Sequence, residues 1–370
     1  MRCDNPILIG GCGSSGTTLL SHLLSKHPEI YCGPEWYIAH VPQLFRKWSV
    51  LSADHRRQLL MGGIDGVPHV EAETLSWLVN GQRCSVTKFV NRKHRRGRAA
   101  DDATLIEWAR GAASLPEFAD LFFGDLLHKA CKTRWCEKTP VNCYAIGEIL
   151  EAYPQARYIH TVRDGRDVAL SLIARSYDAR QAVQRWLYDT STIFPFIDHP
   201  RCLLVKYEEL VQSPEQTLGE VLVFIGSDPE LAQTMIQAAS GGKADFRAVR
   251  SWSESPTNPI SAKHIGKWRG MEHGVKAELA RYFHHVFLSP DCASRLGLGR
   301  ALNANAVNRA FGYPRDPAWP EGNALSFALL KEFLRERRGD VVTAPYSGIS
   351  LVARQPRSLG RWSAHTRARR

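Results

Sequence analysis

The sequence PILIGGCGSSGTTLLSHLL, residues 6–24, contains a short apolar run, a glycine-rich segment and a stretch with apolar residues at helical spacing. An apolar strand, a glycine loop and a helix therefore follow one another directly. This is the context in which the pattern G-x-x-x-x-G-K-[ST] binds phosphate. We expect residues 11–18 to form a phosphate-binding loop at the end of a buried strand.

The loop differs from that of nucleotide kinases at one position. Thr17 occupies the place of the lysine that reaches the β- and γ-phosphates, and the best-placed second strand ends in Arg163 instead of a metal-binding Asp. Backbone N–H groups and the hydroxyls of Ser14, Ser15, Thr17 and Thr18 suit a single phosphate without a metal. The kinase interpretation is therefore disfavoured, while a glycine turn that only packs helix on strand stays an alternative.

Residues 158–173 repeat the order of strand, turn and helix. Arg163 ends the expected strand, and Ser171 follows two helical turns later. Arginine is suited to bidentate capture of phosphate oxygens. Together with the first loop, this pair would suit a nucleotide phosphorylated at two places. Alternatively, the charged residues of the turn form only surface ion pairs.

Strands that alternate with helices predict an α/β fold with a mainly parallel sheet flanked by helices, a P-loop NTPase-like three-layer sandwich. A third strand is expected at residues 203–207, followed by a helix for which Ser213 is the expected N-cap. Residues of about 40–130 show helical periodicity and predict a helical insertion. We expect one domain over residues 1–316 and a C-terminal extension with a basic tail over residues 317–370.

The chain is basic, with a formal net charge of +11 and a pI of about 9.3. Residues 88–98 and 354–370 carry much of this excess, which favours anionic partners. No nucleic-acid module and no interleaving of aromatic with basic residues is present, so nucleic acid is not expected as a partner. No apolar run has the length of a membrane span, and the nine cysteines lack zinc-site spacing. We expect a cytoplasmic protein without a metal.

Three blocks, in order, resemble the sulfotransferases that use 3′-phosphoadenosine 5′-phosphosulfate (PAPS) and release 3′-phosphoadenosine 5′-phosphate (PAP). The blocks are GSSGTTLL…HPEIYCGPE, EKTPVNCYAIGEILEAYPQARYIHTVRDGRDVALSL and LLVKYEELVQSPEQTLGEVLVFIG. The resemblance is greatest to the tyrosylprotein sulfotransferase branch and its bacterial relatives. It covers roughly residues 6–316 and implies transfer of a sulfuryl group from PAPS to a hydroxyl, without a metal.

The resemblance also implies roles for individual residues. Glu35 matches the proposed general base, and Lys138 matches a lysine near the phosphosulfate. The residues implied in binding the donor nucleotide are Gly13, Ser14, Ser15, Gly16, Thr17 and Thr18 in the loop, Arg163 and Ser171 for the 3′-phosphate, Tyr207, and Lys267 in a late closing segment. A histidine base is the alternative, with His160 interpreted as a core residue and His264 and His94 as open candidates.

One departure from the family pattern concerns Ser14, where the family usually carries Arg or Lys. Loss of such a donor lowers rates by roughly a hundredfold or more. We expect Lys138 or another cation to compensate. The alternative is a catalytically weak nucleotide- or anion-binding protein of the same fold. The acceptor stays open among a peptide tyrosine, a glycan and a small alcohol or phenol, and it could itself be anionic. The oligomeric state also stays open, and a homodimer is one of the alternatives.

Overall fold

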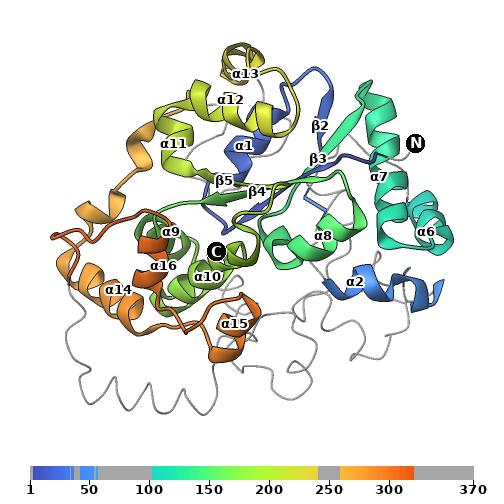
Figure 1. Ribbon diagram of the computed structural model, residues 1–370. Helices are drawn as coiled ribbons and strands as arrows, with labels where there is room; N and C mark the ends of the chain where they lie inside the picture. The colour runs from blue at the N-terminus through green and yellow to red at the C-terminus, as the bar shows by residue number, and fades with distance from the viewer. Residues whose placement is uncertain are drawn as a thin grey trace, which may run out of the picture.

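The computed structural model describes residues 3–33, 35–36, 42–53, 56, 102–240 and 259–320. At its centre lies one five-stranded parallel sheet (Figure 1). Its strands are β1 (Ile7–Gly11), β2 (Ile30–Cys32), β3 (Arg134–Lys138), β4 (Arg157–Val162) and β5 (Cys202–Lys206).

The strand order is β2-β3-β1-β4-β5, so β1 is the central strand and pairs on both sides. Ile9 lies opposite Lys138 of β3, and Gly11 lies opposite Thr161 of β4. In a parallel sheet all carboxyl ends meet at one edge, and β1 is where the chain order changes direction across the sheet. The loop after β1 therefore emerges between the ends of β3 and β4.

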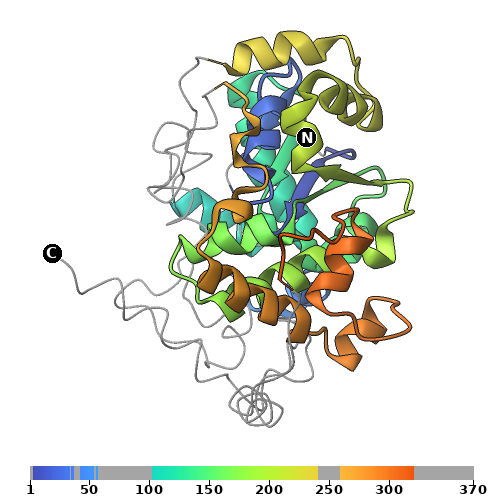
Figure 2. The ribbon, with the colours of Figure 1, turned by 90° about the vertical axis from the view of Figure 1, so that its left-hand side faces the viewer.

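Helices cover both faces of the sheet (Figures 1 and 2). One layer contains α1 (Thr17–Leu24), α11 (Tyr207–Gln212), α12 (Pro214–Phe224) and α13 (Leu231–Ala239). The other layer includes α8 (Ile146–Ala152), α9 (Gly165–Ile173), α10 (Ala179–Ser191), α14 (His273–His285) and α16 (Ala304–Ala310). The prediction of an α/β fold with a parallel sheet flanked by helices is confirmed.

The remaining elements lie around these layers. They are α2 (Pro42–Lys47), η1 (Trp48–Val50), α6 (Asp102–Gly111), α7 (Leu115–Ala130), η2 (Pro140–Ala145), η3 (Phe194–Phe196), η4 (Ala262–His264), η5 (Lys267–Gly270) and α15 (Pro290–Arg295). None of the helices in the described part of the chain has both the length and the apolar character of a membrane span.

The side-chain alternation of β1 divides the core into two parts. Ile7 and Ile9 pack with α1, α12 and α13, whereas Leu8 faces the larger cluster formed with α7, α8 and α10. Alternation with period two sends neighbouring side chains of a strand to opposite faces. Because both faces are covered, the strand is apolar throughout, which explains why its sequence predicted a buried strand.

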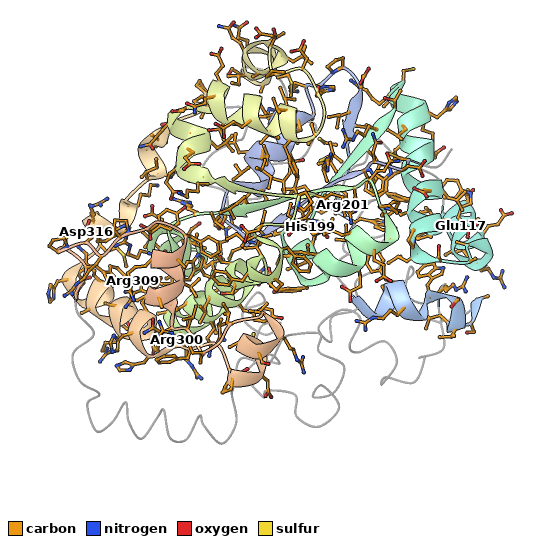
Figure 3. All side chains as sticks on the ribbon, viewed as in Figure 1. Glu117, His199, Arg201, Arg300, Arg309 and Asp316 are labelled. Atoms are coloured by element: carbon orange, nitrogen blue, oxygen red, sulfur yellow. The ribbon has the colours of Figure 1, made fainter. Side chains whose placement is uncertain are left out.

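One arginine side chain links α8 to the segment before β5 through hydrogen bonds to backbone carbonyl groups. Arg201, labelled in Figure 3 just before β5, donates from Nη1 to the carbonyl oxygens of Leu150 and Tyr153, each at 2.9 Å. These carbonyls lie at the C-terminal end of α8, where they have no partner within the helix. The contact holds α8 against the edge of the sheet that carries β4 and β5.

Some local predictions differ from the structure. The strands β2 and β3 were not predicted, and Tyr207, expected to end a strand, begins α11. Ser213 occupies the N-cap of α12 as expected but makes no capping hydrogen bond. The described parts of the expected insertion contain helices, while residues 57–101 and 321–370, with both basic stretches, lie outside the described residues. The proposed domain boundaries stay predictions.

Gly11 permits the sharp turn from β1 into the loop. Its φ of 130° is unfavourable for any residue with a Cβ atom, and a Cβ there would collide with the carbonyl oxygen of Thr161 on β4. Both problems involve backbone, which cannot move without separating β1 from β4.

We predict that Gly11→Ala lowers the free energy of unfolding by about 2–4 kcal/mol, because it adds backbone strain and a clash in the sheet centre. Denaturant unfolding followed by circular dichroism measures this. Gly111→Ala at the end of α6 is the control, since no atom lies within 4 Å of its Cβ position. A Gly11→Ala protein as stable as wild type would contradict the strained geometry.

Candidate active site

The loop between β1 and α1 presents donors to the space beyond the sheet edge. Gly16, the N-cap of α1, has a φ of 92° and contributes no side-chain cap. The Ser15 N–H donates to the carbonyl oxygen of Cys12 at 3.2 Å, and its buried hydroxyl has no described partner. An uncapped helix N-terminus and an unpartnered hydroxyl provide hydrogen-bond donors for an anion. The loop fits a phosphate group.

The turn after β4 contacts this loop directly. Arg163 donates from Nη1 to the carbonyl oxygen of Ser14 at 3.1 Å, and the Ser171 hydroxyl lies 3.1 Å from that of Ser14. The positive φ of Ser14, 75°, is part of the loop turn that makes both contacts. The structure thus brings the two predicted phosphate-binding segments together. Arg163 also forms an ion pair with Asp167 at 3.6 Å.

Tyr207 lies over the loop from the start of α11. A Cβ on Gly16 would lie 2.9 Å from Cδ2 of its ring, so the close packing requires glycine. The Arg163 guanidinium stacks on the same ring at 4.4 Å from the centroid. A cation over an aromatic face is stabilised by the ring quadrupole, and this fixes the direction of the guanidinium. Tyr207, Gly16 and Arg163 therefore form one packed unit.

The segment with Lys267 is attached to this unit through buried polar contacts. Asp167 accepts from the N–H groups of Gly266 at 2.7 Å and Trp268 at 3.1 Å. Burial raises the pKa of Asp167, although Arg163 and the two N–H groups counteract the shift. The Lys267 side chain itself is exposed. The structure thus places the segment that carries Lys267 next to Asp167, the ion-pair partner of Arg163.

Glu35 and Lys138 form a direct ion pair at the same sheet edge. Lys138 is the last residue of β3, and Glu35 follows β2, its neighbour in the sheet. The Glu35 side chain is only 12% exposed, and the Lys138 side chain only 8%. A carboxylate and an ammonium are thereby held together in a poorly solvated place next to the strand that carries the loop.

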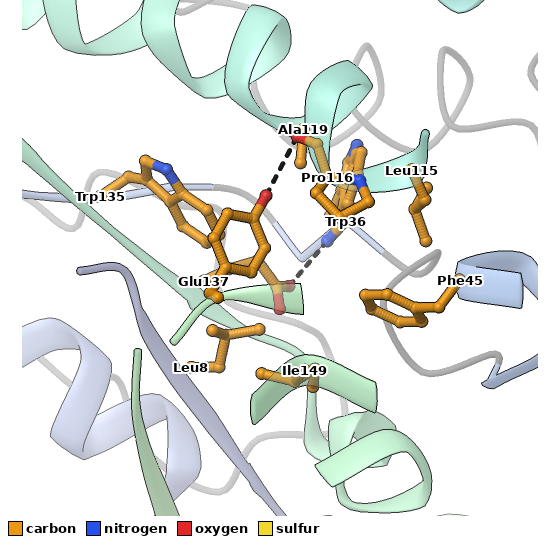
Figure 4. A pocket seen from close by; sticks show the side chains of 10 residues that line it. Leu8, Trp36, Phe45, Leu115, Pro116, Ala119, Trp135, Glu137 and Ile149 are labelled. Carbon is orange, nitrogen blue, oxygen red and sulfur yellow. Dashed lines mark hydrogen bonds between the residues drawn. The ribbon is translucent and has the colours of Figure 1, made fainter. Parts of the chain in front are cut away.

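A buried carboxylate that we did not predict, Glu137, supports this pair from the opposite face of β3. It accepts a hydrogen bond from the backbone N–H of Trp36 at 2.9 Å (Figure 4), and further bonds from Thr139 and Asn142. Trp36 follows Glu35 in the sequence, and Glu137 precedes Lys138. The Glu137 carboxylate therefore links the two chain segments that carry the ion pair. Burial, despite these donors, raises the pKa of Glu137 to about 7.

The hollow shown in Figure 4 lies on the Glu137 face of β3 and not at the loop. Its lining is mostly apolar and aromatic: Leu8, Trp36, Phe45, Leu115, Pro116, Ala119, Trp135, Ile149 and Tyr153 surround Glu137. Alternation along β3 sends Lys138 to the other side. The hollow is therefore a gap in the aromatic packing behind the ion pair.

The histidine candidates differ in burial. His160 in β4 is completely buried, with Nδ1 3.3 Å from the Tyr158 hydroxyl, and burial lowers its pKa to about 3. Its interpretation as a core residue agrees with this environment. Burial and the neighbouring Lys267 lower the pKa of His264, whose carbonyl oxygen accepts from Arg163. His94 lies outside the described residues.

Two arginines near the loop were not singled out from the sequence. Arg175 follows α9, and its buried Nε has no described partner. Arg185 lies on α10, with Nη2 4.0 Å from the position that a Cβ on Gly13 would take. Neither belongs to a recognisable motif, and only the packing of α10 against α9 places both beside the loop.

Comparison with known proteins identifies the class. The model of the sulfotransferase family matches residues 6–230, and the chain belongs to this family. The fold agrees with the sulfotransferase domain of the Synechococcus PCC 7002 olefin synthase, with a TM-score of 0.53 and 19% identity over 85% of this chain and 97% of that one. The predicted family resemblance is confirmed.

Within the family, the curated relatives include protein-tyrosine sulfotransferases. The chain is 25% identical to protein-tyrosine sulfotransferase 2 of Gallus gallus, covering 71% of this chain and 63% of the relative. It is 24% identical to the protein-tyrosine sulfotransferase of Drosophila melanogaster, covering 72% and 48%, respectively. The chain thus spans about half to two thirds of the length of these relatives.

The raised pKa of Glu137 predicts a specific pH dependence of stability. Between pH 4.5 and about 7 the native state binds more protons at this site than the unfolded state, so stability falls as pH rises through this window. The shift corresponds to a loss of about 3 kcal/mol above pH 7 relative to acid. We expect Glu137→Gln to unfold with a flatter pH dependence in this window.

Urea unfolding at several pH values tests this expectation. Glu107→Gln, which changes an exposed carboxylate on α6, is the control and should keep the wild-type slope. Identical slopes in wild type and Glu137→Gln would show that Glu137 does not titrate in this way.

Proposed function

We propose that this protein is a sulfotransferase that moves a sulfuryl group from PAPS to the hydroxyl of an acceptor. The observation that carries the proposal is the convergence of three elements at one sheet edge. These are a phosphate loop without the kinase lysine, the pair Arg163 and Ser171, and the ion pair of Glu35 with Lys138. Family membership supports the proposal.

The donor nucleotide fits the polar groups of the site. The N-terminus of α1 and the hydroxyls of Ser15, Thr17 and Thr18 would hold the 5′-phosphate. Arg163 and Ser171 would hold the 3′-phosphate, exchanging their contacts with Ser14 for phosphate oxygens. The loop and the arginine turn are separate segments, so each phosphate would have its own set of donors.

PAPS supplies an activated sulfuryl group when bound. Glu35 then accepts the proton of the acceptor hydroxyl. Lys138 has three N–H donors, so it can bond to Glu35 and to a sulfuryl oxygen at once. Donors fixed before the reaction stabilise developing charge without reorganisation, which is the usual main source of catalysis in such transfers. Glu137 would position the base through the backbone of Trp36.

The similarity to protein-tyrosine sulfotransferases makes a peptide tyrosine the first acceptor to test. A glycan hydroxyl and a small alcohol or phenol follow, since no described contact selects among them. The second candidate function is a nucleotide binder that transfers slowly, because the loop itself carries no basic residue from Cys12 to Thr18.

Nucleotide calorimetry tests the two-phosphate site. We predict that PAP binds roughly 10–100-fold more tightly than adenosine 5′-monophosphate, since an arginine contact to a phosphate is a charge-assisted hydrogen bond. Ser171→Ala should reduce this preference without changing the affinity for the monophosphate. Equal affinities of wild type for the two nucleotides would contradict the assignment of Arg163 and Ser171.

Turnover with labelled PAPS and a tyrosine-containing acidic peptide tests the base. We predict that Glu35→Gln lowers kcat by about 10²–10⁴-fold, the usual range for loss of a general base, while the Kd for PAP stays the same. His160→Gln is the comparison and should retain activity in its folded fraction. Unchanged turnover of Glu35→Gln would remove Glu35 from this role, and PAP binding without any transfer would favour the slow binder.

A further inference from the structure

The described site has a deficit of positive charge on the loop side. Residues 12–18 contain no Lys or Arg. During transfer, however, negative charge grows on the leaving phosphate, and the sulfuryl oxygens carry negative charge as well. The Arg163 guanidinium is occupied by Ser14 and by the carbonyl oxygen of His264. A cation that belongs to another element is therefore needed next to the loop.

We propose that Arg185 of α10 is a catalytic residue that supplies this cation, an inference that rests on the proposed sulfotransferase function. Its Nη2 lies 4.0 Å from the position that a Cβ on Gly13 would take. Glycine at this place leaves the approach between guanidinium and loop open. A planar guanidinium can donate to two oxygens at once, which suits neighbouring sulfuryl and phosphate oxygens.

The other two nitrogen atoms of the Arg185 guanidinium, Nε and Nη1, are held by hydrogen bonds. Nε donates to Asp189 at 3.3 Å, and Nη1 donates to the hydroxyl of Tyr177. Asp189 is only 1% exposed and also accepts from the Tyr144 hydroxyl, whereas the Arg185 side chain is 32% exposed. Nη2 makes no hydrogen bond to a described residue. One side of the guanidinium is thus anchored on a buried carboxylate, and Nη2 remains available on the loop side.

The position of α10 is fixed at the neighbouring residue. Trp186 is buried and donates from Nε1 to the carbonyl oxygen of Arg163 at 3.3 Å. The residue that follows Arg185 is therefore bonded to the turn that carries the predicted 3′-phosphate contact. This bond limits movement of Arg185 relative to the loop, which is the arrangement that preorganised charge stabilisation requires.

The same side of the loop is in electrostatic range of the proposed base. Arg175 interacts electrostatically with Arg185, with Cys12 of the loop and with Glu35. A donor with its 5′-phosphate on the loop would extend its sulfuryl group toward Glu35 and Lys138. Arg185 would then stand beside the reacting bond.

In the transfer step, the acceptor oxygen forms a bond to sulfur as the bond from sulfur to the bridging phosphate oxygen breaks. The electron pair of that bond stays on the 5′-phosphate of PAP, and the acceptor proton passes to Glu35. Arg185 stabilises the charge that accumulates on the bridging oxygen. The cation on α10 replaces the basic residue that the family usually carries at position 14. Ser14 instead contacts the Ser171 hydroxyl through its own hydroxyl.

Arg185→Gln tests the proposal, with Arg300→Gln as a control that removes an exposed arginine elsewhere in the molecule (Figure 3). We expect Arg185→Gln to lower kcat with labelled PAPS and the peptide acceptor by about 100-fold, the usual effect of losing one preorganised donor. The Kd for PAP, measured by calorimetry, should rise less than kcat falls, because the other phosphate contacts remain and only the transition state also engages the sulfuryl oxygens. Arg185→Lys should recover part of the rate.

If the single variant does not fold because Asp189 is left as an unpaired buried charge, Arg185→Gln combined with Asp189→Asn removes both charges and is tested in the same way. Unchanged turnover, or a loss of PAP affinity as large as the loss of turnover, would overturn the assignment. Failure of the proposed function appears differently, as a wild-type protein that transfers nothing to any acceptor. In that case calorimetry decides on Arg185: a loss of PAP affinity greater than the loss of PAPS affinity supports it, because the former bridging oxygen carries its full charge only in PAP, and equal losses overturn it.

Discussion

The pairing of β1 with β3 on one side and β4 on the other is the constraint on which the whole site depends. Parallel pairing brings the carboxyl ends of all three strands to one edge. Its register places the end of β3, with Lys138, and the end of β4, with Arg163, on either side of the glycine loop. Residues from distant parts of the sequence thus meet without any long connecting structure.

The sequence was informative where the structural signal is local. The loop, α1 and the turn with Arg163 follow from glycine spacing and apolar runs within about twenty residues, and they form as predicted. β3 was missed because its residues RWCEK read as polar, and its charged end becomes buried only through partners supplied elsewhere. Tertiary contacts of this kind override the hydrophobic pattern of a short strand.

The same distinction applies to the candidate site. Glu35 and Lys138 were identified by resemblance, but their direct contact joins residues 103 positions apart. Glu137 and Arg185 carry no motif. In the sequence of α10, Arg185 is one of several polar residues on an amphipathic helix, and only its contact with the buried Asp189 distinguishes it from a solvated arginine. Sequence spacing cannot reveal such a pairing across a fold.

Two buried carboxylates explain how the site is kept rigid, and they do so differently. Asp189 is compensated by a guanidinium and a hydroxyl, so replacement of one partner leaves an uncompensated charge. Glu137 has no described cation among its hydrogen-bond partners, only neutral donors, and burial favours its protonated form. Such groups reduce stability compared with apolar packing, and they persist where they position functional residues. Their locations, behind Arg185 and behind the pair of Glu35 with Lys138, are the two places where the proposed transfer would require fixed charge.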